Sequence, residues 1–485
     1  MPFLLLAILL GFLTYWVIQR SVASITRTPV WLLWFVMMIP VWVLTLWLLL
    51  YGDKQPPVVM LYGLFILCPL VYMLLIFLGR LPAATVSQTT PAAKPAQPEK
   101  PITRDEETHL QRCFPWTVYY LQNIEYRPHA MICRGQLKTS PGVAYETVQE
   151  NVQAEFGERF LVLLQEGLNG KPFFALVPNP AFKTQSPSKD KPVPPLYRPG
   201  LAIALLGMTL LTTTLAGGVY VGELSVGELQ AQPSLFLQGL AYGLSLMLIL
   251  GVHELGHYLM ARRYQIQATL PYFIPVPFFL GTFGAFIQLR SPVPNRRALF
   301  DVGIAGPLAG LVVTVPILLW GLAHSTVIAL PEDASLLNFN ALDPTGSVIL
   351  TLLGKLALGA NLQAEQAIDL HPVAVAGCLG LVVTALNLMP VGQLDGGHIV
   401  HAMYGQRTGA IIGQISRFLV LVLAWIHQEF FLWAILLFFI PAVDEPALND
   451  VSELDSRRDL IGLLALTLLV MIVLPAPKAL TQLLF

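Results

Sequence analysis

Residues 235–264 read LFLQGLAYGLSLMLILGVHELGHYLMARRY, and this stretch decides the fold. About twenty apolar residues lead into the pentapeptide His253-Glu-Leu-Gly-His257, which is enough for a helix that crosses a bilayer. Ionisable side chains inside such a helix are costly, so they indicate a function. The stretch therefore predicts a membrane helix that carries a chemical site.

The pentapeptide places both histidines on one helix face, because positions i and i+4 point the same way. Two imidazole nitrogens supply half of a tetrahedral zinc shell. Glu254 stands beside them and can take a proton from a zinc-activated water. The same pattern also arises by chance in soluble helices. Its place in an apolar span, together with a second motif far along the chain, favours a metal site.

The composition is typical of a membrane protein. Of 485 residues, 55% are hydrophobic and 12% charged, against about 25% charged in soluble proteins. A net charge of −1 provides no basic field for nucleic acid, so no nucleic-acid partner is expected. The four cysteines show no CxxC spacing. Cys113 and Cys133 could pair, but two reduced thiols are favoured.

We expect an α-helical polytopic membrane protein with about ten transmembrane helices and a small α+β cytoplasmic domain inserted after the third. The first apolar segment lacks a basic n-region and a cleavage site, which predicts a retained helix. The expected parts are three transmembrane helices in 1–81, a linker at 82–102, the α+β domain at 103–182, a linker at 183–198 and a membrane core with C-terminal helices at 199–485.

Lys and Arg placement predicts the orientation. Arg20 and Arg27 put the first connection inside, so the α+β domain is expected on the cytoplasmic side, or on the stromal side in a plastid. Residues 348–360 are too short to cross and predict an interfacial helix. The block 411–442 fits either one long helix or, as the charges favour, a hairpin. The expected spans are 1–18, 30–51, 58–79, 199–220, 235–262, 298–322, 371–390, 411–442 and 459–475.

The domain at 103–182 shows its own pattern. Residues 119–126, 130–137, 160–164 and 173–177 are strand-like, and 145–156 predict a charged helix. It contains no cluster of catalytic residue types. By the predicted orientation it lies on the side where the site opens, and it is placed to screen or recruit substrates.

A second motif stands at the inner end of another predicted span. It reads Asn387-Leu-Met-Pro390-Val-Gly-Gln-Leu-Asp395-Gly-Gly397. Pro390 breaks the helix, and the glycine pair lets the backbone turn tightly so that a carboxylate can face inward. Asp395 is the candidate third zinc ligand; alone, it could equally be a helix N-cap. Both motifs end at the same depth and on the same side.

With both motifs present, residues 199–475 resemble the site-2 protease family of intramembrane zinc metalloproteases. The extra N-terminal spans and the small domain resemble the cyanobacterial and chloroplast branch of that family. The resemblance implies that His253, His257 and Asp395 bind one zinc ion per chain. It also implies that Glu254 is the general base and that Asn387 holds the substrate carbonyl or oxyanion. The implied substrates are single-pass or polytopic membrane proteins, cleaved in a plasma or thylakoid membrane near its cytoplasmic or stromal side. The oligomeric state is not predicted.

Other features leave alternatives open. His398 and His401 could bind metal but are expected to support or flank the site, since catalytic zinc needs three protein ligands. Residues 268–290 predict either a hairpin whose edge pairs with an unwound substrate or a loop that plugs the core. The small residues from Gly306 to Gly310 predict helix packing without chemistry. The alternative function is a non-catalytic zinc-binding membrane chaperone or a metal transporter, against which the intact Glu254 argues.

Overall fold

The computed structural model describes residues 28–51 and most of 104–485, together with Ile102 and single residues between 11 and 79. The chain divides into two compact units, Met1–Gln97 and Pro98–Phe485. The gaps within the second unit are 128–129, 168–169, 180–197, 223, 225–231, 277–279, 332–333, 337, 427–429 and 442. The predicted linkers and most of the predicted spans 1–18 and 58–79 therefore fall outside the described residues.

The first unit is described mainly by α2, Val30–Tyr51, which lies in the predicted second span. Trp34 donates its indole N–H to the carbonyl of Gly11 at 2.7 Å. The ring of Tyr15 meets the ring of Trp34 edge-on. Trp34 therefore links α2 to Gly11 and Tyr15, which precede it in the chain.

The second unit begins with a four-stranded antiparallel sheet in the order β1-β2-β4-β3. Alternating burial along β3 shows one face turned to a core. Helix α5 covers that face, and the hydroxyl of its Tyr145 donates to the carbonyl of Val162 in β3. The elements are α4 (Arg104–Arg112), β1 (Tyr119–Arg127), β2 (Ala130–Leu137), α5 (Pro141–Phe156), η1 (Gly157–Arg159), β3 (Phe160–Glu166) and β4 (Pro172–Pro178).

The predicted strands and helix of this region all lie within these elements. Residues rich in aromatic and aliphatic side chains form the four strands. Helix α5 begins four residues earlier than expected because Pro141 occupies its first turn. Cys113 and Cys133 are free and buried, so the reduced alternative holds. Burial raises the pKa of the Cys113 thiol to about 11 and of the Cys133 thiol to about 12.

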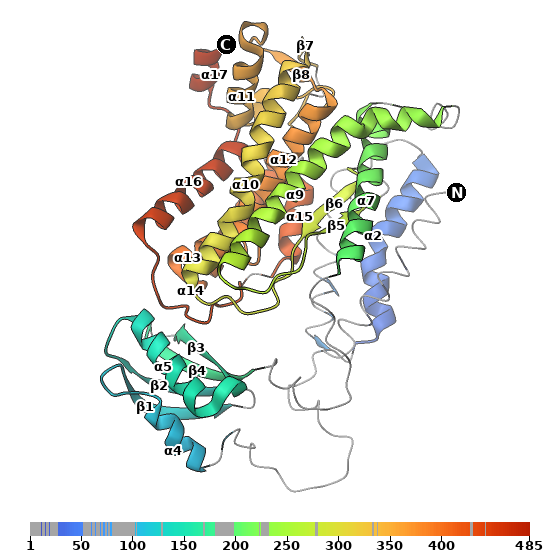
Figure 1. The fold of residues 1–485 in the computed structure, drawn as a ribbon. Helices are drawn as coiled ribbons and strands as arrows, with labels where there is room; N and C mark the ends of the chain where they lie inside the picture. The colour runs from blue at the N-terminus through green and yellow to red at the C-terminus, as the bar shows by residue number, and fades with distance from the viewer. Residues whose placement is uncertain are drawn as a thin grey trace. The chain divides into compact units, whose positions relative to one another are not determined.

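The rest of the second unit is a bundle of apolar helices. In Figure 1, α9, α10 and α12 run side by side through its middle. The helices and 3₁₀ or π segments are α7 (Pro199–Ala216), η2 (Gly217–Val221), η3 (Pro233–Gly239), α9 (Leu240–Arg263), α10 (Arg296–Ala323), η4 (Pro344–Gly346), α11 (Val348–Leu358), η5 (Gly359–Asn361), α12 (Pro372–Leu388), α13 (Asp395–Tyr404), α14 (Gln406–Ile426), α15 (Phe431–Phe439), α16 (Ser456–Val473) and α17 (Lys478–Leu484).

Among the described residues, four helices are long and apolar enough to cross a membrane, or five if the bent pair α16–α17 counts as one span. The molecule is therefore a mostly helical membrane-associated protein. The count of ten stays a prediction. Part of the difference lies in α12, which has 17 residues and is shorter than an ordinary span.

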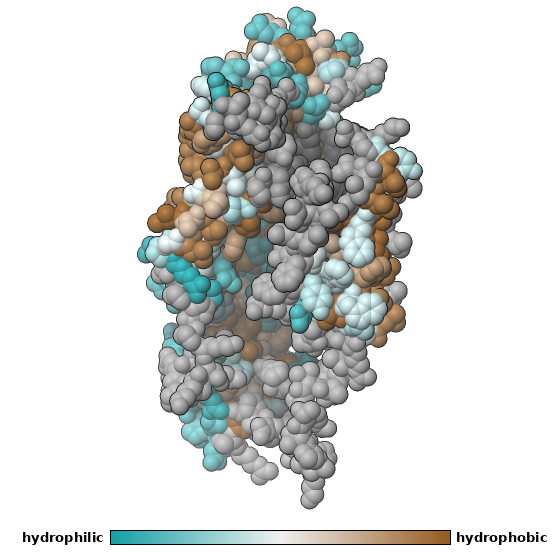
Figure 2. Space-filling model, turned by 90° about the vertical axis from the view of Figure 1, so that its right-hand side faces the viewer, coloured by the Kyte–Doolittle hydropathy of each residue, from teal (hydrophilic) through white to brown (hydrophobic). Residues whose placement is uncertain are grey.

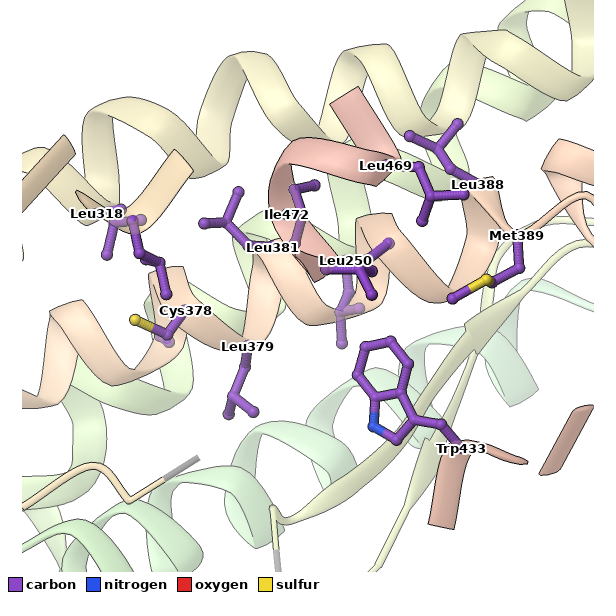
Figure 3. Packing of buried hydrophobic residues seen from close by; sticks show 14 of the residues in the cluster. Leu250, Leu318, Cys378, Leu379, Leu381, Leu388, Met389, Trp433, Leu469 and Ile472 are labelled. Atoms are coloured by element: carbon purple, nitrogen blue, oxygen red, sulfur yellow. The ribbon is translucent and has the colours of Figure 1, made fainter. Parts of the chain in front are cut away.

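Helix α12 is the buried centre of the bundle. Figure 3 shows its Cys378, Leu379, Leu381 and Leu388 side chains among those of the neighbouring helices. Leu250 of α9, Leu318 of α10 and Leu469 of α16 belong to the same buried cluster. A helix enclosed by protein in this way needs no apolar face toward lipid, and it is apolar all round.

Helix α14 shows the opposite pattern. Ile411, Ile415, Phe418 and Trp425 follow one another three to seven residues apart and are 61%, 54%, 64% and 80% exposed. Such a stripe of exposed apolar side chains is suited to contact with lipid. Figure 2, which views the molecule from the right-hand side of Figure 1, shows further exposed hydrophobic residues at mid-height and hydrophilic residues toward the top.

Two segments for which the sequence left alternatives open have a defined secondary structure. Residues 268–290 contain an antiparallel hairpin of β5 (Tyr272–Pro275) and β6 (Thr282–Phe286). The block 411–442 contains two helices, α14 and α15, and Arg417 of α14 donates to the carbonyl of Ile440 after α15. The chain therefore returns along α14, as the hairpin alternative requires. A second pair, β7 (Thr326–Ala329) and β8 (Gln366–Asp369), closes the loop between α10 and α12.

Candidate metal centre

The two motifs, 138 residues apart in sequence, meet at a group of three metal-ligating side chains. Nε2 of His253 and Nε2 of His257 lie 3.2 Å from each other. Oδ2 of Asp395 lies 3.4 Å from the first nitrogen and 3.2 Å from the second. Both histidines are almost fully buried. Three such atoms form a nearly equilateral triangle.

This triangle fits zinc. Bonds of about 2.0–2.1 Å to nitrogen and oxygen in a tetrahedron place neighbouring ligand atoms about 3.3 Å apart. The observed separations of 3.2–3.4 Å match that edge. A shell of two imidazoles and one carboxylate leaves the fourth position for water or substrate, as catalytic zinc sites do. Among the described residues, no other His, Cys, Asp and Glu group has this geometry.

The imidazole of His257 is oriented by its second nitrogen. Nδ1 lies 2.7 Å from the carbonyl oxygen of Val302 in α10. Because a carbonyl can only accept, Nδ1 must carry the hydrogen, and the lone pair of Nε2 is left for the metal. Helix α10 thus selects the tautomer that zinc binding needs.

Helix α10 also makes room for the ligands through glycine. A Cβ atom added to Gly306 would lie 2.0 Å from Nε2 of His257, and one added to Gly310 would lie 3.2 Å from the ring of His253. The segment from Gly306 to Gly310 was expected to serve helix packing without chemistry, and its glycines also bear on the site. These glycines are packing positions, but the groups that they pack against are the two histidine ligands.

Asp395 reaches the histidines because the chain breaks between α12 and α13. Helix α12 ends at Leu388, before Pro390, and α13 begins at Asp395 itself. The turn lies at Gly392, whose φ is +51°. The glycine pair has another role than the predicted turn. A Cβ on Gly396 would lie 2.0 Å from the carbonyl oxygen of Leu388, so glycine permits the close approach of two backbones.

Glu254 and Asn387 lie in the same cavity as the three ligands. The cavity has a volume of about 260 Å³, and Glu254 is buried in its wall. Nδ2 of Asn387 lies 3.1 Å from Nε2 of His253, so the amide reaches the edge of the metal position. The remaining wall comes from the hairpin, the segment after it, α10, the loop before α13 and α13 itself. Its residues are Ala285, Phe286, Ile287, Leu289, Val302, Gly303, Gln393 and His398.

His398 and His401 are not part of the metal triangle. Both rings point to Asp444, at 2.9 and 2.7 Å. His401 also contacts Asp450 at 2.9 Å. Sequence reasoning missed these aspartates, because they lie in a loop more than forty residues further along the chain and belong to no motif.

A buried His-His-Asp triangle beside a glutamate, enclosed by apolar helices, defines a membrane-embedded metalloprotease. The profile of Peptidase family M50 matches residues 241–426. Residues 241–426 are thus a domain of this family of zinc metalloproteases, the site-2 proteases, and the relatives named below support its chloroplast-like branch. The cofactor of the family, zinc, is the metal that the triangle fits.

Three relatives illustrate the similarity. The probable zinc metalloprotease EGY2, chloroplastic, of Arabidopsis thaliana is 28% identical over 396 residues, which are 79% of this chain and 68% of that protein. The probable zinc metalloprotease EGY1, chloroplastic, of the same plant is 36% identical over 240 residues, 49% and 42% of the two chains. EGY3 of Oryza sativa subsp. indica, named in the same way, is 30% identical over 241 residues, 44% and 38% of the two chains.

The chain spans about two thirds of the length of the EGY2 proteins, 68% in Arabidopsis thaliana and 65% in Oryza sativa subsp. indica. It spans less than half of EGY1 and EGY3. No solved structure matches the chain.

Proposed function

We propose that this protein is an intramembrane endopeptidase that hydrolyses a peptide bond within or near a transmembrane segment, as in regulated intramembrane proteolysis. The observation that carries the proposal is the meeting of His253, His257, Asp395 and Glu254 in one cavity. A metal transporter has no need for a buried glutamate next to a ligand, and a non-catalytic zinc-binding chaperone has no need for a base.

His253, His257 and Asp395 would hold the zinc, which would supply a Lewis acid for the scissile carbonyl and for a water molecule at neutral pH. Glu254 takes the proton that the attacking water loses and delivers it to the leaving amine nitrogen. Asn387, whose amide lies beside His253, is placed to donate to the carbonyl oxygen as it gains negative charge.

The substrate must reach the site with its backbone extended, because an intact helix hides its carbonyl groups in hydrogen bonds. Strand β6 supports such a pose. It belongs to a two-stranded sheet, and its Ala285 and Phe286 line the catalytic cavity. An unwound substrate segment that pairs with this hairpin would run past the metal position. The substrates proposed are therefore single-pass or polytopic membrane proteins.

The proposed topology is multi-pass, with the site near the cytoplasmic or stromal side. Arg262 and Arg263 end α9 just after the histidines, and Arg296 and Arg297 begin α10. Basic residues at both of these ends favour the inner side of the membrane.

The variant Glu254→Gln tests the proposal. It should keep the zinc and the fold but lose most turnover, by about 10²–10⁴-fold, because the base is gone while the ligands remain. Purified full-length protein in proteoliposomes is assayed on a model transmembrane substrate, and zinc is measured in parallel. Glu150→Gln, at an exposed position of α5, is the matched control. Cleavage by Glu254→Gln at close to the normal rate would remove Glu254 from the proposed role.

A further inference from the structure

Two histidines of α13 share one carboxylate oxygen. Nδ1 of His398 and Nδ1 of His401 lie 2.9 and 2.7 Å from Oδ2 of Asp444. Positions three apart on a helix share a face, so both rings leave α13 on the same side. Asp444 is buried, and its other oxygen accepts from the backbone N–H of Glu445. The carboxylate therefore has one fixed orientation.

His401 is held from its other side as well. Nε2 lies 2.9 Å from Oδ1 of Asp450, and the ring is 1% exposed. Both ring nitrogens face carboxylates, which accept hydrogen bonds when ionised, so both nitrogens donate and the ring is a cation. Arg296, at the start of α10, lies 3.7 Å from the same oxygen of Asp450. The buried charges of this cluster thus have partners of opposite sign.

The two aspartates stand at the ends of one segment, residues 444–450, which we call the bridge segment. On one side the bridge segment pairs with the residues that precede α10. Leu448 N–H donates to the carbonyl of Val293 at 2.9 Å, and Asn449 N–H donates to the carbonyl of Pro294 at 3.0 Å. The bridge segment is therefore fixed to the base of the helix that orients His257.

On its other side the bridge segment pairs with the small sheet. Leu164 of β3 donates to the carbonyl of Leu448 at 2.7 Å and accepts from Asp450 N–H at 2.9 Å. β3 is an edge strand of the sheet, so the bridge segment extends the sheet by strand addition. Leu448 and Val451 pack against the hydrophobic core of the same sheet. The sheet thus holds the segment whose two ends hold α13.

We propose that Asp444 and Asp450 position the metal ligand Asp395 through His398 and His401, and that the small sheet sets this position by holding the bridge segment. The proposal rests on the proposed function and names a positioning device for the same site. Asp395 is the first residue of α13, and His398 and His401 lie one and two turns further. A rotation or shift of this ten-residue helix moves the Asp395 carboxylate with it. Metal coordination tolerates only about 0.2 Å.

The variant Asp444→Asn tests the first step in the full-length protein. An amide cannot accept from both histidines while it also satisfies the N–H of Glu445, so α13 loses part of its support. Zinc affinity, measured by competition with a chromogenic chelator, should fall about 10–100-fold. On a model substrate, kcat should fall while KM stays close to its normal value. Wild-type zinc affinity together with wild-type kcat overturns the proposal.

Glu445→Gln is the matched control, because the adjacent side chain is exposed and undergoes the same chemical change. It should leave zinc affinity and kcat as they are. If Asp444→Asn is not recovered folded, Asp444→Glu keeps the charge and moves the carboxylate by one methylene. If Asp444 positions α13, the zinc affinity of Asp444→Glu should lie below that of the wild type but remain measurable. A wild-type zinc affinity in this variant overturns the proposal.

Leu448→Asp tests the link to the sheet. It places a charge against the sheet core while Asp444 and Asp450 remain, and zinc affinity should fall in the same direction as in Asp444→Asn. Val143→Asp adds the same charge at an exposed position of α5 and should change nothing. Normal zinc affinity in Leu448→Asp overturns the link. These zinc affinities are measured without substrate. They therefore test the positioning of Asp395 independently of the proposed function, even if neither the wild type nor any variant cleaves a substrate.

Discussion

Gly306 lies directly against His257: a Cβ atom at this glycine would stand 2.0 Å from the Nε2 atom of the histidine. Since Nε2 is the atom offered to the metal, Gly306→Ala must push the ligand out of the triangle. We expect the purified variant to lose zinc and all measurable cleavage while it keeps its helical content. Zinc analysis and circular dichroism check this together.

Two other glycines grade the effect. A Cβ atom added at Gly310 would lie 3.2 Å from the ring of His253, which is tight but leaves more room than at Gly306. Gly310→Ala should therefore weaken zinc affinity without abolishing binding. Gly207 of α7 has no neighbour within 4 Å of such an atom, and Gly207→Ala should behave as wild type. Stoichiometric zinc in Gly306→Ala would contradict the packing argument.

The ligand set predicts an order among three substitutions. Asp395→Ala removes an atom of the triangle and should cause the largest loss of zinc. His401→Ala and His398→Ala remove only support for α13 and should cause smaller losses. Zinc retained after dialysis against a moderate chelator gives the order. The assignment of the third ligand is wrong if a histidine variant loses the metal and Asp395→Ala retains it.

The metal triangle could be predicted because its residue types and spacings follow from chemistry. Two histidines one turn apart on a helix, and an aspartate after a proline-broken helix end, have few other reasons to occur together in an apolar segment. The strands of the small sheet were also predictable, because their residues are rich in aromatic and aliphatic side chains and β3 alternates between buried and less buried positions. Local pattern was sufficient in both cases.

The bridge segment could not be predicted because its contacts are distant in sequence and made largely by the backbone. Asp444 meets His398 across 46 residues, and the pairing with Leu164 involves N–H and carbonyl groups that every residue carries. The nine-residue helix α4 was missed because Leu110 is its one aliphatic residue, too few to set up an apolar pattern.

The number of membrane crossings shows a further limit of sequence reasoning. An apolar run indicates burial, but burial in lipid and burial in protein give the same composition. Helix α12 is apolar because neighbouring helices enclose it, whereas α14 is apolar toward its exposed face. The orientation inferred from Lys and Arg placement also stays a prediction.

The two small-domain thiols should be free but unreactive. Burial raises the pKa of Cys113 to about 11 and of Cys133 to about 12, so neither is a thiolate at pH 8. A maleimide should leave both unlabelled in the native protein and label both after denaturation without reductant. Mass spectrometry of the peptides measures this. Absence of labelling in the denatured protein would instead indicate a disulfide.

The His401–Asp444 contact should make stability depend on pH. α13 lies outside the candidate spans. Burial lowers the pKa of His401, but hydrogen bonds to Asp444 and Asp450 outweigh it and raise the pKa from 6.5 to about 9. A raised folded-state pKa gives stabilisation that is complete below pH 6.5 and lost as pH rises through 9.

The comparison of wild type with Asp444→Asn measures this contribution. Burial raises the pKa of Asp444, but the two histidines lower it to about 2, so this carboxylate remains ionised throughout the range above pH 5. The difference in Tm should therefore be largest near pH 6 and should shrink toward pH 9.5. A difference that grows with pH would contradict the ion pair.

Residues 103–182 should act on substrate choice. β3 in this region pairs with the bridge segment, which in turn pairs with Val293 and Pro294, a few residues after the cavity-lining Leu289. A folded domain held so close to the cavity mouth restricts which substrates approach. Deletion of 103–182 should therefore raise the cleavage rate of a substrate with a large folded extramembrane domain relative to that of a short model helix. The two rates are measured for the full-length and the deleted protein at saturating zinc, so that any change in metal affinity affects both substrates alike. An unchanged ratio of the two rates would show that the domain does not select substrates.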